Sequence, residues 1–214
     1  ELAPTRIQSV LKTLGSVFPY LWVFLSDGDS NDLLLVASAQ PLALRLSSIE
    51  QQLYVYRQLF ADMDLQTPAE LLALWLFDET TVATFSAPLN TDDNGYIEFG
   101  APKDLLAHAG DEPGAALLAT TLGQRHLLIQ RLLQDDRLSF SDRLIDLSEG
   151  YLLQGMLKDA KAAHEAAVQR SPRLTERVDR LRELIALFSE DADQERVVDE
   201  QMLRNDLSYT KAVK

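Results

Sequence analysis

The feature that most constrains the fold is a pair of short apolar runs, Leu21–Leu25 and Leu33–Ala37, separated by a polar turn. Runs of this length and composition, bounded by Asp, Gly, Ser and Asn residues, predict two β-strands in an antiparallel hairpin. Because the apolar character is nearly continuous rather than alternating, we expect both faces of each strand to be covered. The hairpin is therefore expected to be the margin of a larger α/β sheet.

Helices and one further strand are expected around this hairpin. Apolar spacing predicts a helix over residues 4–17, and Thr67-Pro68-Ala69-Glu70 has the pattern of a capping box that begins a helix reaching Phe77. The alternation in Tyr96–Phe99 predicts a short strand. A helix is also expected from Ser47 or Ser48, with these apolar residues along one face: Ile49, Leu53, Tyr56, Leu59, Phe60 and Met63.

The second half of the sequence contains only helical patterns. Gly100, Pro102 and a change in charge indicate a domain boundary near residue 103, which gives predicted domains at 1–103 and 104–214. The apolar periodicity predicts helices at 115–133, 142–154, 158–169, 174–188 and 194–204.

Composition excludes several classes of protein. The 214 residues carry a net charge of −13, which argues against nucleic acid as a partner because phosphate binding needs a basic surface. No apolar run approaches the roughly 20 residues that span a bilayer, so no transmembrane segment is expected. Cysteine is absent and the three histidines are widely spaced, so no metal site of these ligands is predicted. A start at Glu1 without a leader pattern suggests a piece of a longer chain.

Residues 147–172 carry a first resemblance. Six positions, Leu147, Tyr151, Gly155, Ala160, Ala167 and Pro172, have the spacing of a tetratricopeptide repeat, and the segment resembles this helix–turn–helix family. The resemblance implies that Gly155 and Ala160 let two helices approach closely, that Leu147 and Tyr151 fill the seam, and that Pro172 ends the second helix. It further implies a concave helical surface for a protein partner. A generic helical hairpin is the alternative.

Five segments of the first half carry a second resemblance: Val17-Phe18-Pro19, Leu33–Ser38, Pro41-Leu42, Ala87–Asp93 and Ile97–Pro102. Together they resemble the C-terminal part of spermidine-synthase-like proteins, closest to the bacterial group often fused to a membrane domain. The resemblance implies an α/β fragment, the end of a methyltransferase-type Rossmann sheet with its antiparallel hairpin. An all-α helical-repeat tail follows it.

The resemblance to spermidine synthases also implies what the chain lacks. An intact parent of this kind transfers an aminopropyl or related group and uses decarboxylated S-adenosylmethionine or S-adenosylmethionine, held near a glycine-rich turn. The nine glycines here are scattered, and no counterpart of the family's catalytic aspartate is found. We therefore assign no catalytic residue and expect no cofactor in this chain alone. Asp27–Asp32 replaces the family's polyamine-contacting Tyr-Pro-x-Gly segment, which puts polyamine specificity in question.

The loop that follows Ala87 contains the candidate ligand-facing residues Asn90, Thr91, Asp92 and Asp93. Asp92 and Asp93 are the carboxylates that could attract a cationic amine. Asn90, Asp92, Asn94 and Gly95 also imitate half of a calcium loop, but Ala101 stands where its bidentate glutamate belongs. A turn in which side chains accept hydrogen bonds from nearby backbone N–H groups is the simpler interpretation.

Arginines cluster around residues 170–182, with Glu176, Asp179 and Glu183 interspersed, which predicts ion pairs on a solvated helix face.

Three functions remain open. The chain is the C-terminal portion of a spermidine-synthase-like protein with a helical interaction tail, a non-enzymatic scaffold, or a calcium-stabilised binding domain. The first implies two partners, a protein on the tail and the remainder of the parent chain, and a place in the cytoplasm or at the cytoplasmic face of a membrane.

Overall fold

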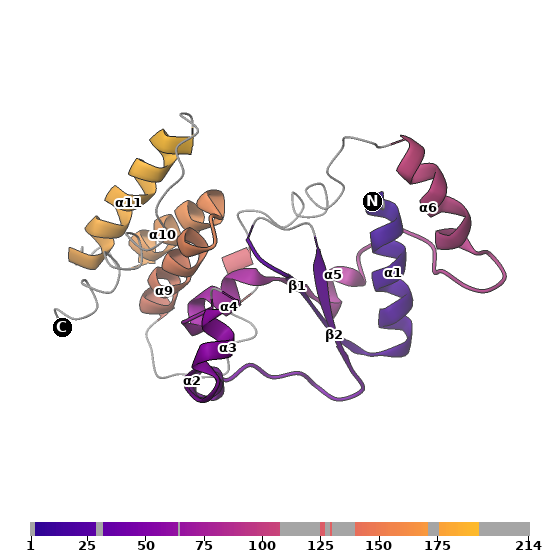
Figure 1. The fold of residues 1–214 in the computed structure, drawn as a ribbon, viewed down its shortest axis with the longest axis horizontal. Coiled ribbons are helices and arrows are strands. Elements are labelled where there is room, and N and C mark those ends of the chain that lie inside the picture. The colour runs from indigo at the N-terminus through magenta and orange to yellow at the C-terminus, as the bar shows by residue number, and fades with distance from the viewer. Residues whose placement is uncertain are drawn as a thin grey trace. The chain divides into compact units, whose positions relative to one another are not determined.

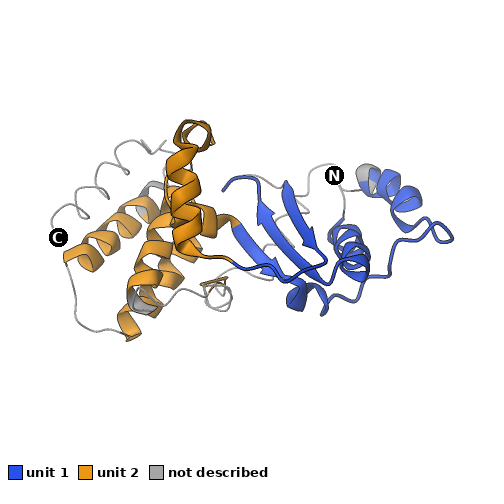
Figure 2. Cartoon of the chain, turned by 90° about the horizontal axis from the view of Figure 1, so that it is seen from below, with its two compact units in different colours: residues 1–43, 75–122 blue, residues 44–74, 123–214 orange. Residues whose placement is uncertain are grey.

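The computed structural model describes residues 3–28, 32–63, 65–107, 125–126, 129, 140–170 and 176–192 (Figure 1). The chain forms two compact units, which Figure 2 colours separately. Unit 1 consists of Glu1–Ala43 and Trp75–Leu122, and unit 2 of Leu44–Leu74 and Gly123–Lys214. These contact-based units divide the chain differently from the predicted boundary near residue 103. That boundary lies inside helix α6, Tyr96–Ala107, and the segment 44–74 belongs with the helices of the second half.

Unit 1 contains a three-stranded antiparallel sheet in the order β2-β1-β3. Strands β1 (Tyr20–Leu25) and β2 (Leu33–Ser38) pair from Tyr20↔Ser38 to Leu25↔Leu33, which confirms the predicted hairpin. The central strand β1 is buried along almost its whole length. The fold is therefore mixed α/β, with a small open sheet and a majority of helix.

The third strand was not predicted. Helix α4 (Pro68–Leu74) ends where strand β3 (Trp75–Asp78) begins, so the expectation of one helix through Phe77 is wrong. Residues 75–78 are all buried and pair with β1, Phe77 opposite Val23, so tertiary pairing overrides the helical continuation. Asp78 then ends the strand, because its side chain accepts hydrogen bonds from the N–H groups of Thr80 and Thr81 and caps helix α5 (Glu79–Val82).

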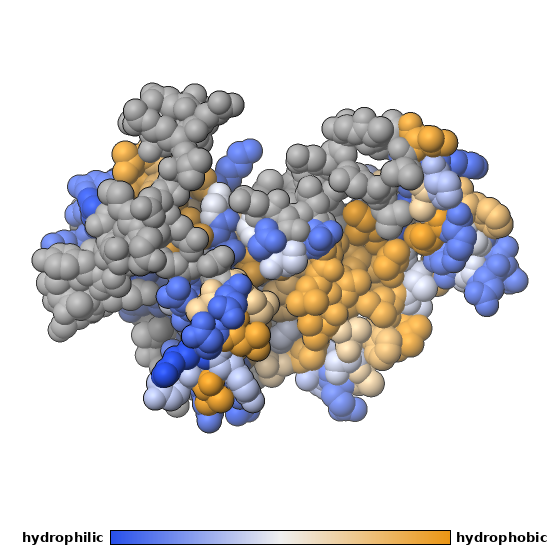
Figure 3. Space-filling model, in the orientation of Figure 1, coloured by the Kyte–Doolittle hydropathy of each residue, from blue (hydrophilic) through white to orange (hydrophobic). Residues whose placement is uncertain are grey.

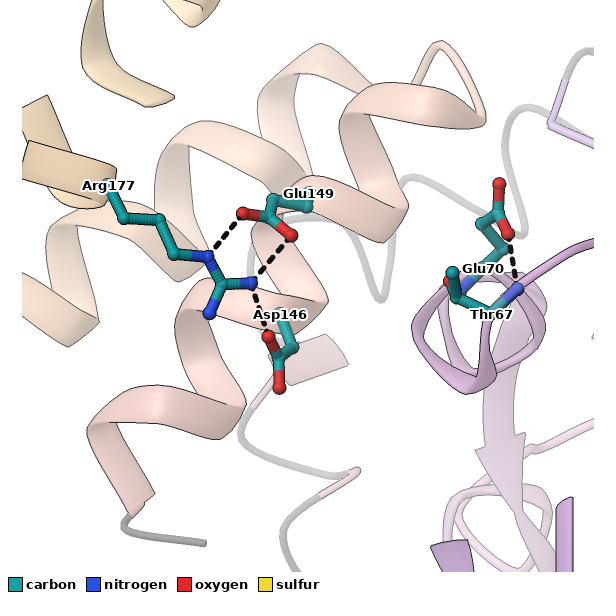
Figure 4. Close-up of polar contacts among 5 residues, drawn as sticks. All are labelled: Thr67, Glu70, Asp146, Glu149 and Arg177. Carbon is teal, nitrogen blue, oxygen red and sulfur yellow. Dashed lines mark hydrogen bonds and ion pairs between the residues drawn. The ribbon is translucent and has the colours of Figure 1, made fainter. Parts of the chain in front are cut away.

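The start of α4 is as predicted. The Thr67 N–H donates to Glu70 Oε2 at 2.6 Å, and the Glu70 N–H donates back to Thr67 Oγ1 at 3.3 Å (Figure 4). This reciprocal pair is the capping box. Glu70 is fully buried, and its carboxylate also accepts from the Gln66 N–H at 2.8 Å, so the buried charge is held by backbone donors.

Strand β2 departs from the prediction that both faces of the hairpin are covered. Leu34 is 58% exposed and Val36 is 37% exposed. The two side chains lie on the same face because successive residues of a strand alternate. Within the described part of the chain, the apolar side chains of β2 are therefore only partly buried, whereas those of β1 are almost all buried.

Helix α1 (Pro4–Val17) confirms the prediction for residues 4–17 and contacts β1, α5 and α6. Arg6 joins it to α6 by three contacts: an ion pair with Asp104 at 3.2 Å, a hydrogen bond to the Tyr96 carbonyl at 3.0 Å, and stacking over the Tyr96 ring. Gly100 leaves room for this guanidinium, since a Cβ there would collide with it. Helix α1 is thus fixed to α6, the last described helix of unit 1.

Unit 2 is helical in the part that the structure describes. Its helices, besides α4, are α2 (Leu46–Val55), α3 (Arg57–Ala61), α9 (Phe140–Leu153), α10 (Leu157–Arg170) and α11 (Glu176–Ala192). The last three confirm the helices predicted at 142–154, 158–169 and 174–188. Most of the predicted helix at 115–133 and all of that at 194–204 lie outside the described residues, although Arg125, His126 and Ile129 are helical.

The helix predicted from residue 47 to Met63 is interrupted. Tyr56 leaves the helical conformation, with φ −108° and ψ 29°, and separates α2 from α3. The first part buries Ile49 and Leu53 as expected, whereas Leu59 and Met63 are more than half exposed. The prediction of one continuous helix with these residues on one face is wrong, because the break at Tyr56 divides it into two helices.

Helices α4 and α9 pack closely at Gly150. A Cβ at this position would collide with the Ala69 carbonyl, so the two backbones approach nearer than any other residue permits. No helix among the described residues combines the length and apolarity required to cross a bilayer.

We predict that Gly150→Ala lowers the free energy of unfolding by about 1–3 kcal/mol, because the methyl group forces α4 and α9 apart. Gly15→Ala is the control. Its Cβ meets only Val82 at 3.8 Å, so the change should be neutral or stabilise helix α1 by up to about 1 kcal/mol. Urea unfolding followed by circular dichroism measures both, and equal effects of the two substitutions would contradict the close approach.

Candidate functional site

The loop between α5 and α6, which contains the predicted ligand-facing residues, is attached to helix α1. The Ser9 hydroxyl donates to the Pro88 carbonyl at 2.6 Å, and the Asn90 N–H donates to Thr13 Oγ1 at 2.8 Å. Both contacts join residues about eighty positions apart in the chain. The loop therefore has a defined position within unit 1.

Two asparagines organise the loop. Asn94 Oδ1 accepts from the N–H groups of Thr91 at 3.1 Å and Tyr96 at 3.0 Å, and Asn90 Oδ1 accepts from the Ile97 N–H at 2.8 Å. Gly95, with φ +45°, provides the left-handed turn. These bonds cap helix α6, so the predicted strand at Tyr96–Phe99 is wrong. Four alternating residues were too few to outweigh a strong helix start.

The same hydrogen bonds use two of the side-chain oxygens that a calcium ion would need. The oxygens of Asn90 and Asn94 that would face a cation already accept backbone N–H groups, as expected for a turn closed by its own side chains. No group of three His, Asp or Glu residues suited to a metal ion occurs within the described ranges. Thr91, Asp92 and Asp93 are exposed at the tip, so the loop presents two carboxylates to solvent.

The second candidate site is the helical hairpin of α9 and α10. Leu147, Tyr151, Ala160 and Ala167 are all buried in unit 2, with at most 4% of each residue exposed. Pro172 lies outside the described residues. These four positions of the repeat pattern are therefore core residues of unit 2, and their place in a tetratricopeptide-type seam stays a prediction.

Gly155 has a different role from the one expected. Its φ is +71°, its N–H donates to the Leu152 carbonyl, and the Met156 N–H donates to the Tyr151 carbonyl at 2.8 Å. This is the Schellman motif, in which a left-handed residue satisfies the last carbonyls of a helix. Gly155 thus terminates α9 and turns the chain into α10, rather than lying between the helices.

Polar side chains hold the three helices of the tail together. The buried Ser148 hydroxyl donates to the Ala160 carbonyl at 2.7 Å, and His164 Nε2 lies 3.1 Å from the Val178 carbonyl, joining α10 to α11.

The Arg125 guanidinium lies over the Tyr151 ring at 5.1 Å. Burial raises the pKa of the Tyr151 hydroxyl, against the opposing charge of Arg125, so this side chain stays a neutral phenol.

One polar contact in the described part of unit 2 was not revealed by the sequence. Arg177 on α11 donates to both carboxylate oxygens of Glu149 on α9, at 2.7 and 2.6 Å, and also pairs with Asp146 (Figure 4). Glu149 is only 2% exposed. Burial alone would lower the pKa of Arg177, but the hydrogen bonds and charges of Glu149 and Asp146 raise it. The predicted helical ion pairs also occur, between Arg180 and Glu183 and between Arg182 and Asp179.

A groove of about 440 Å³ lies between α10 and α11. Val168, Ile185 and Ala186 provide its apolar part, and Lys161, Glu165 and Arg182 its charged part. The groove is therefore lined by both apolar and charged side chains.

Comparison with known proteins does not extend these observations. No family model, no curated protein and no solved structure matches the chain.

We predict that Asn94→Ala lowers the free energy of unfolding by about 1 kcal/mol, because two backbone N–H groups lose their acceptor. Asp92→Ala, at an exposed position of the same loop, should change it by less than about 0.5 kcal/mol. Thermal unfolding of both variants distinguishes the roles, and a larger effect of the Asp92 substitution would contradict the capping assignment.

We predict that Arg177→Met lowers the free energy of unfolding by about 3–5 kcal/mol, because the buried carboxylate of Glu149 loses two charge-assisted hydrogen bonds. Arg182→Met is the matched control on the same helix. It breaks only an exposed pair with Asp179, which is worth about 0.3–0.5 kcal/mol. Chemical denaturation measures both, and similar losses would show that the Arg177 contact is not the dominant one.

Proposed function

We propose that this chain is the C-terminal portion of a spermidine-synthase-like protein and that its helical unit is a protein-interaction module. By itself it is not a catalyst. The observation that carries the interaction role is the packing of α9 and α10, in which four of the six positions of the repeat pattern are buried and the hairpin closes at a glycine cap. In such repeats, each unit needs a neighbour to cover its remaining face.

Two observations support the α/β part of the proposal. The strands of the family-like segment form the antiparallel hairpin β1–β2, and the Ala87–Asp93 loop is closed by Asn90 and Asn94. The described sheet is wholly antiparallel, whereas nucleotide-like cofactors bind in the crevice at the carboxyl ends of parallel strands. The cofactor site of the parent is therefore formed by residues outside this chain.

In the parent, the reaction is transfer of an aminopropyl or related alkyl group from a sulfonium donor to an amine. Decarboxylated S-adenosylmethionine or S-adenosylmethionine would supply the alkyl group. The C–S bond of the sulfonium breaks as the new C–N bond forms, so the donor leaves as a neutral thioether and the amine nitrogen loses a proton. The exposed Asp92 and Asp93 contribute a local negative potential that attracts a cationic amine. The parent acts in the cytoplasm or at the cytoplasmic face of a membrane.

A non-enzymatic scaffold is the second candidate. It is favoured by the structural use of the loop, because Asn90 and Asn94 close the turn and only the tip carboxylates face outward. A fold of enzymatic origin can be retained for binding alone.

The test that separates enzyme from scaffold is calorimetric titration with decarboxylated S-adenosylmethionine. We expect binding to the intact parent and none to the 214-residue chain. Binding by the chain alone would contradict the absence of a cofactor site, and no binding by a folded parent would favour the scaffold.

We predict that Asp92→Asn combined with Asp93→Asn in the intact parent weakens amine binding severalfold, because each carboxylate adds attraction for a cation. Asn94→Ala, which perturbs the loop without changing its charge, is the comparison. Titration with a polyamine at low and moderate salt measures the effect, and unchanged affinity of the double variant rejects a role in substrate attraction.

A further inference from the structure

Asn94 is the only asparagine of the sequence that a glycine follows. Asparagine is chemically labile, because the backbone nitrogen of the next residue can attack its side-chain carbonyl carbon. Glycine has no side chain to hinder this attack. The other asparagines precede residues with larger side chains: Asn31 precedes Asp, Asn90 precedes Thr and Asn205 precedes Asp. The Asn94-Gly95 pair is therefore the position of this sequence at which the reaction is intrinsically fastest.

The reaction converts the carboxamide of Asn94 into a carboxylate and consumes only water. The Gly95 nitrogen attacks Cγ of Asn94 and a new C–N bond forms. The bond from Cγ to the side-chain nitrogen breaks, and the Gly95 amide proton goes to this nitrogen, which leaves as ammonia. Water then opens the resulting cyclic imide at either of its carbonyl carbons. One opening gives aspartate, and the other gives isoaspartate, in which the main chain runs through the former side chain.

The loop before helix α6 presents the carboxamide of Asn94 in one orientation. Its Oδ1 accepts from the N–H groups of Thr91 at 3.1 Å and Tyr96 at 3.0 Å, and its Nδ2 donates to the Leu89 carbonyl at 2.8 Å. Two N–H donors on Oδ1 stabilise negative charge on that oxygen, so they do not oppose addition at Cγ. Asn94 is also exposed to water. A barrier imposed by the folded loop must therefore act on the attacking nitrogen.

The attacking nitrogen of Gly95 is held back by two features. Its N–H donates to the Thr91 carbonyl at 2.9 Å, and Gly95 is buried. The Phe99 ring covers this backbone so closely that a Cβ on Gly95 would lie 2.6 Å from Phe99 Cε2. Phe99 itself is 73% exposed, so its ring lies at the surface, between Gly95 and solvent. Since the amide must lose its proton to attack, this hydrogen bond and this cover both slow the reaction until the loop opens.

We propose that Asn94 is a site of spontaneous deamidation, and that the Phe99 ring and the Thr91 carbonyl set its rate by restraining the Gly95 nitrogen. In the folded chain the reaction proceeds through local openings that release this N–H. The inference is independent of the proposed function, because it uses only residues of the described loop and water.

Deamidation changes the loop that carries Asp92 and Asp93. It adds a further negative charge to this exposed tip, where Figure 3 shows a hydrophilic surface at the right-hand edge of the view. Isoaspartate also lengthens the main chain at this point, which moves the side-chain oxygen away from the N–H groups of Thr91 and Tyr96. The start of helix α6 then loses its cap. The modification therefore alters both the charge and the closure of the loop.

Mass spectrometry of the 214-residue chain, incubated at mildly alkaline pH and digested at acidic pH, measures conversion at Asn94. The synthetic peptide 88–100 is the unrestrained reference. We expect aspartate and isoaspartate at position 94, with Asn90 unchanged in the same fragment. The rate in the folded chain should be at least about tenfold lower than in the peptide, because opening must precede attack. Unfolding the chain in urea should remove the difference.

Three outcomes of this experiment overturn the inference. No conversion at position 94 in the peptide or in urea rejects the site. Aspartate without isoaspartate rejects the cyclic imide as the intermediate. Equal rates in the peptide and the folded chain reject the restraint of the Gly95 nitrogen.

Phe99→Ala tests the restraint directly. With the ring removed, deamidation in the folded chain should become severalfold faster, and hydrogen exchange of the Gly95 amide should accelerate with it. Leu106→Ala, at an 86% exposed position of the same helix, is the matched control and should change neither rate. Circular dichroism verifies that both variants are folded. An unchanged rate in folded Phe99→Ala overturns the role of the ring.

If Phe99→Ala does not fold, hydrogen exchange of the unsubstituted chain decides the point. A Gly95 amide that is protected relative to the amide of the exposed Asp93 supports the restraint. Equal exchange of the two amides overturns it.

Discussion

The pairing of β1 with a strand on each side is the constraint on which unit 1 depends. Val23 lies between Leu35 of β2 and Phe77 of β3, and it is fully buried. A strand with five consecutive buried residues requires hydrogen-bonding neighbours at both edges, because an unpaired backbone group away from water costs several times more than the net gain of one hydrogen bond. The hairpin provides one neighbour locally, and the other comes from more than fifty residues further along the chain.

Unit 2 depends instead on helix contacts fixed by a few polar groups. Arg177 joins α11 to α9, His164 joins α10 to α11, and Ser148 joins α9 to α10. Each uses a buried or half-buried donor or acceptor whose partner lies on another helix. Such contacts add little net stability when complete but are costly to break, so they specify one arrangement of the helices.

Several apolar side chains are exposed where the sequence patterns are those of buried elements. Leu34 and Val36 in unit 1, and Leu59 and Met63 in unit 2, are exposed although the sequence patterns around them are those of buried elements. Apolar residues that are exposed singly are common on protein surfaces, so these positions differ from their sequence patterns without identifying a function.

The sequence by itself determined the elements whose signals are local. The capping box at Thr67–Glu70, the helix at 4–17, the hairpin and the buried residues of the α9–α10 seam all follow from neighbours within a few positions. The loop after Ala87 was also identified as a turn closed by its own side chains. These features depend on short-range hydrogen bonds and periodicity, which do not require knowledge of the rest of the fold.

Only the tertiary structure decided the remainder. Trp75–Asp78 became a strand because β1 offered a free edge, and helix α6 is joined to α1 by the contacts of Arg6 with Asp104 and the Tyr96 carbonyl. The break between α2 and α3 at Tyr56 and the hydrogen bond between Arg177 of α11 and Glu149 of α9 likewise depend on where these residues lie in the folded chain. An apolar run of four residues fits either a helix or a strand, and the choice falls to whichever partner in the folded chain satisfies its backbone.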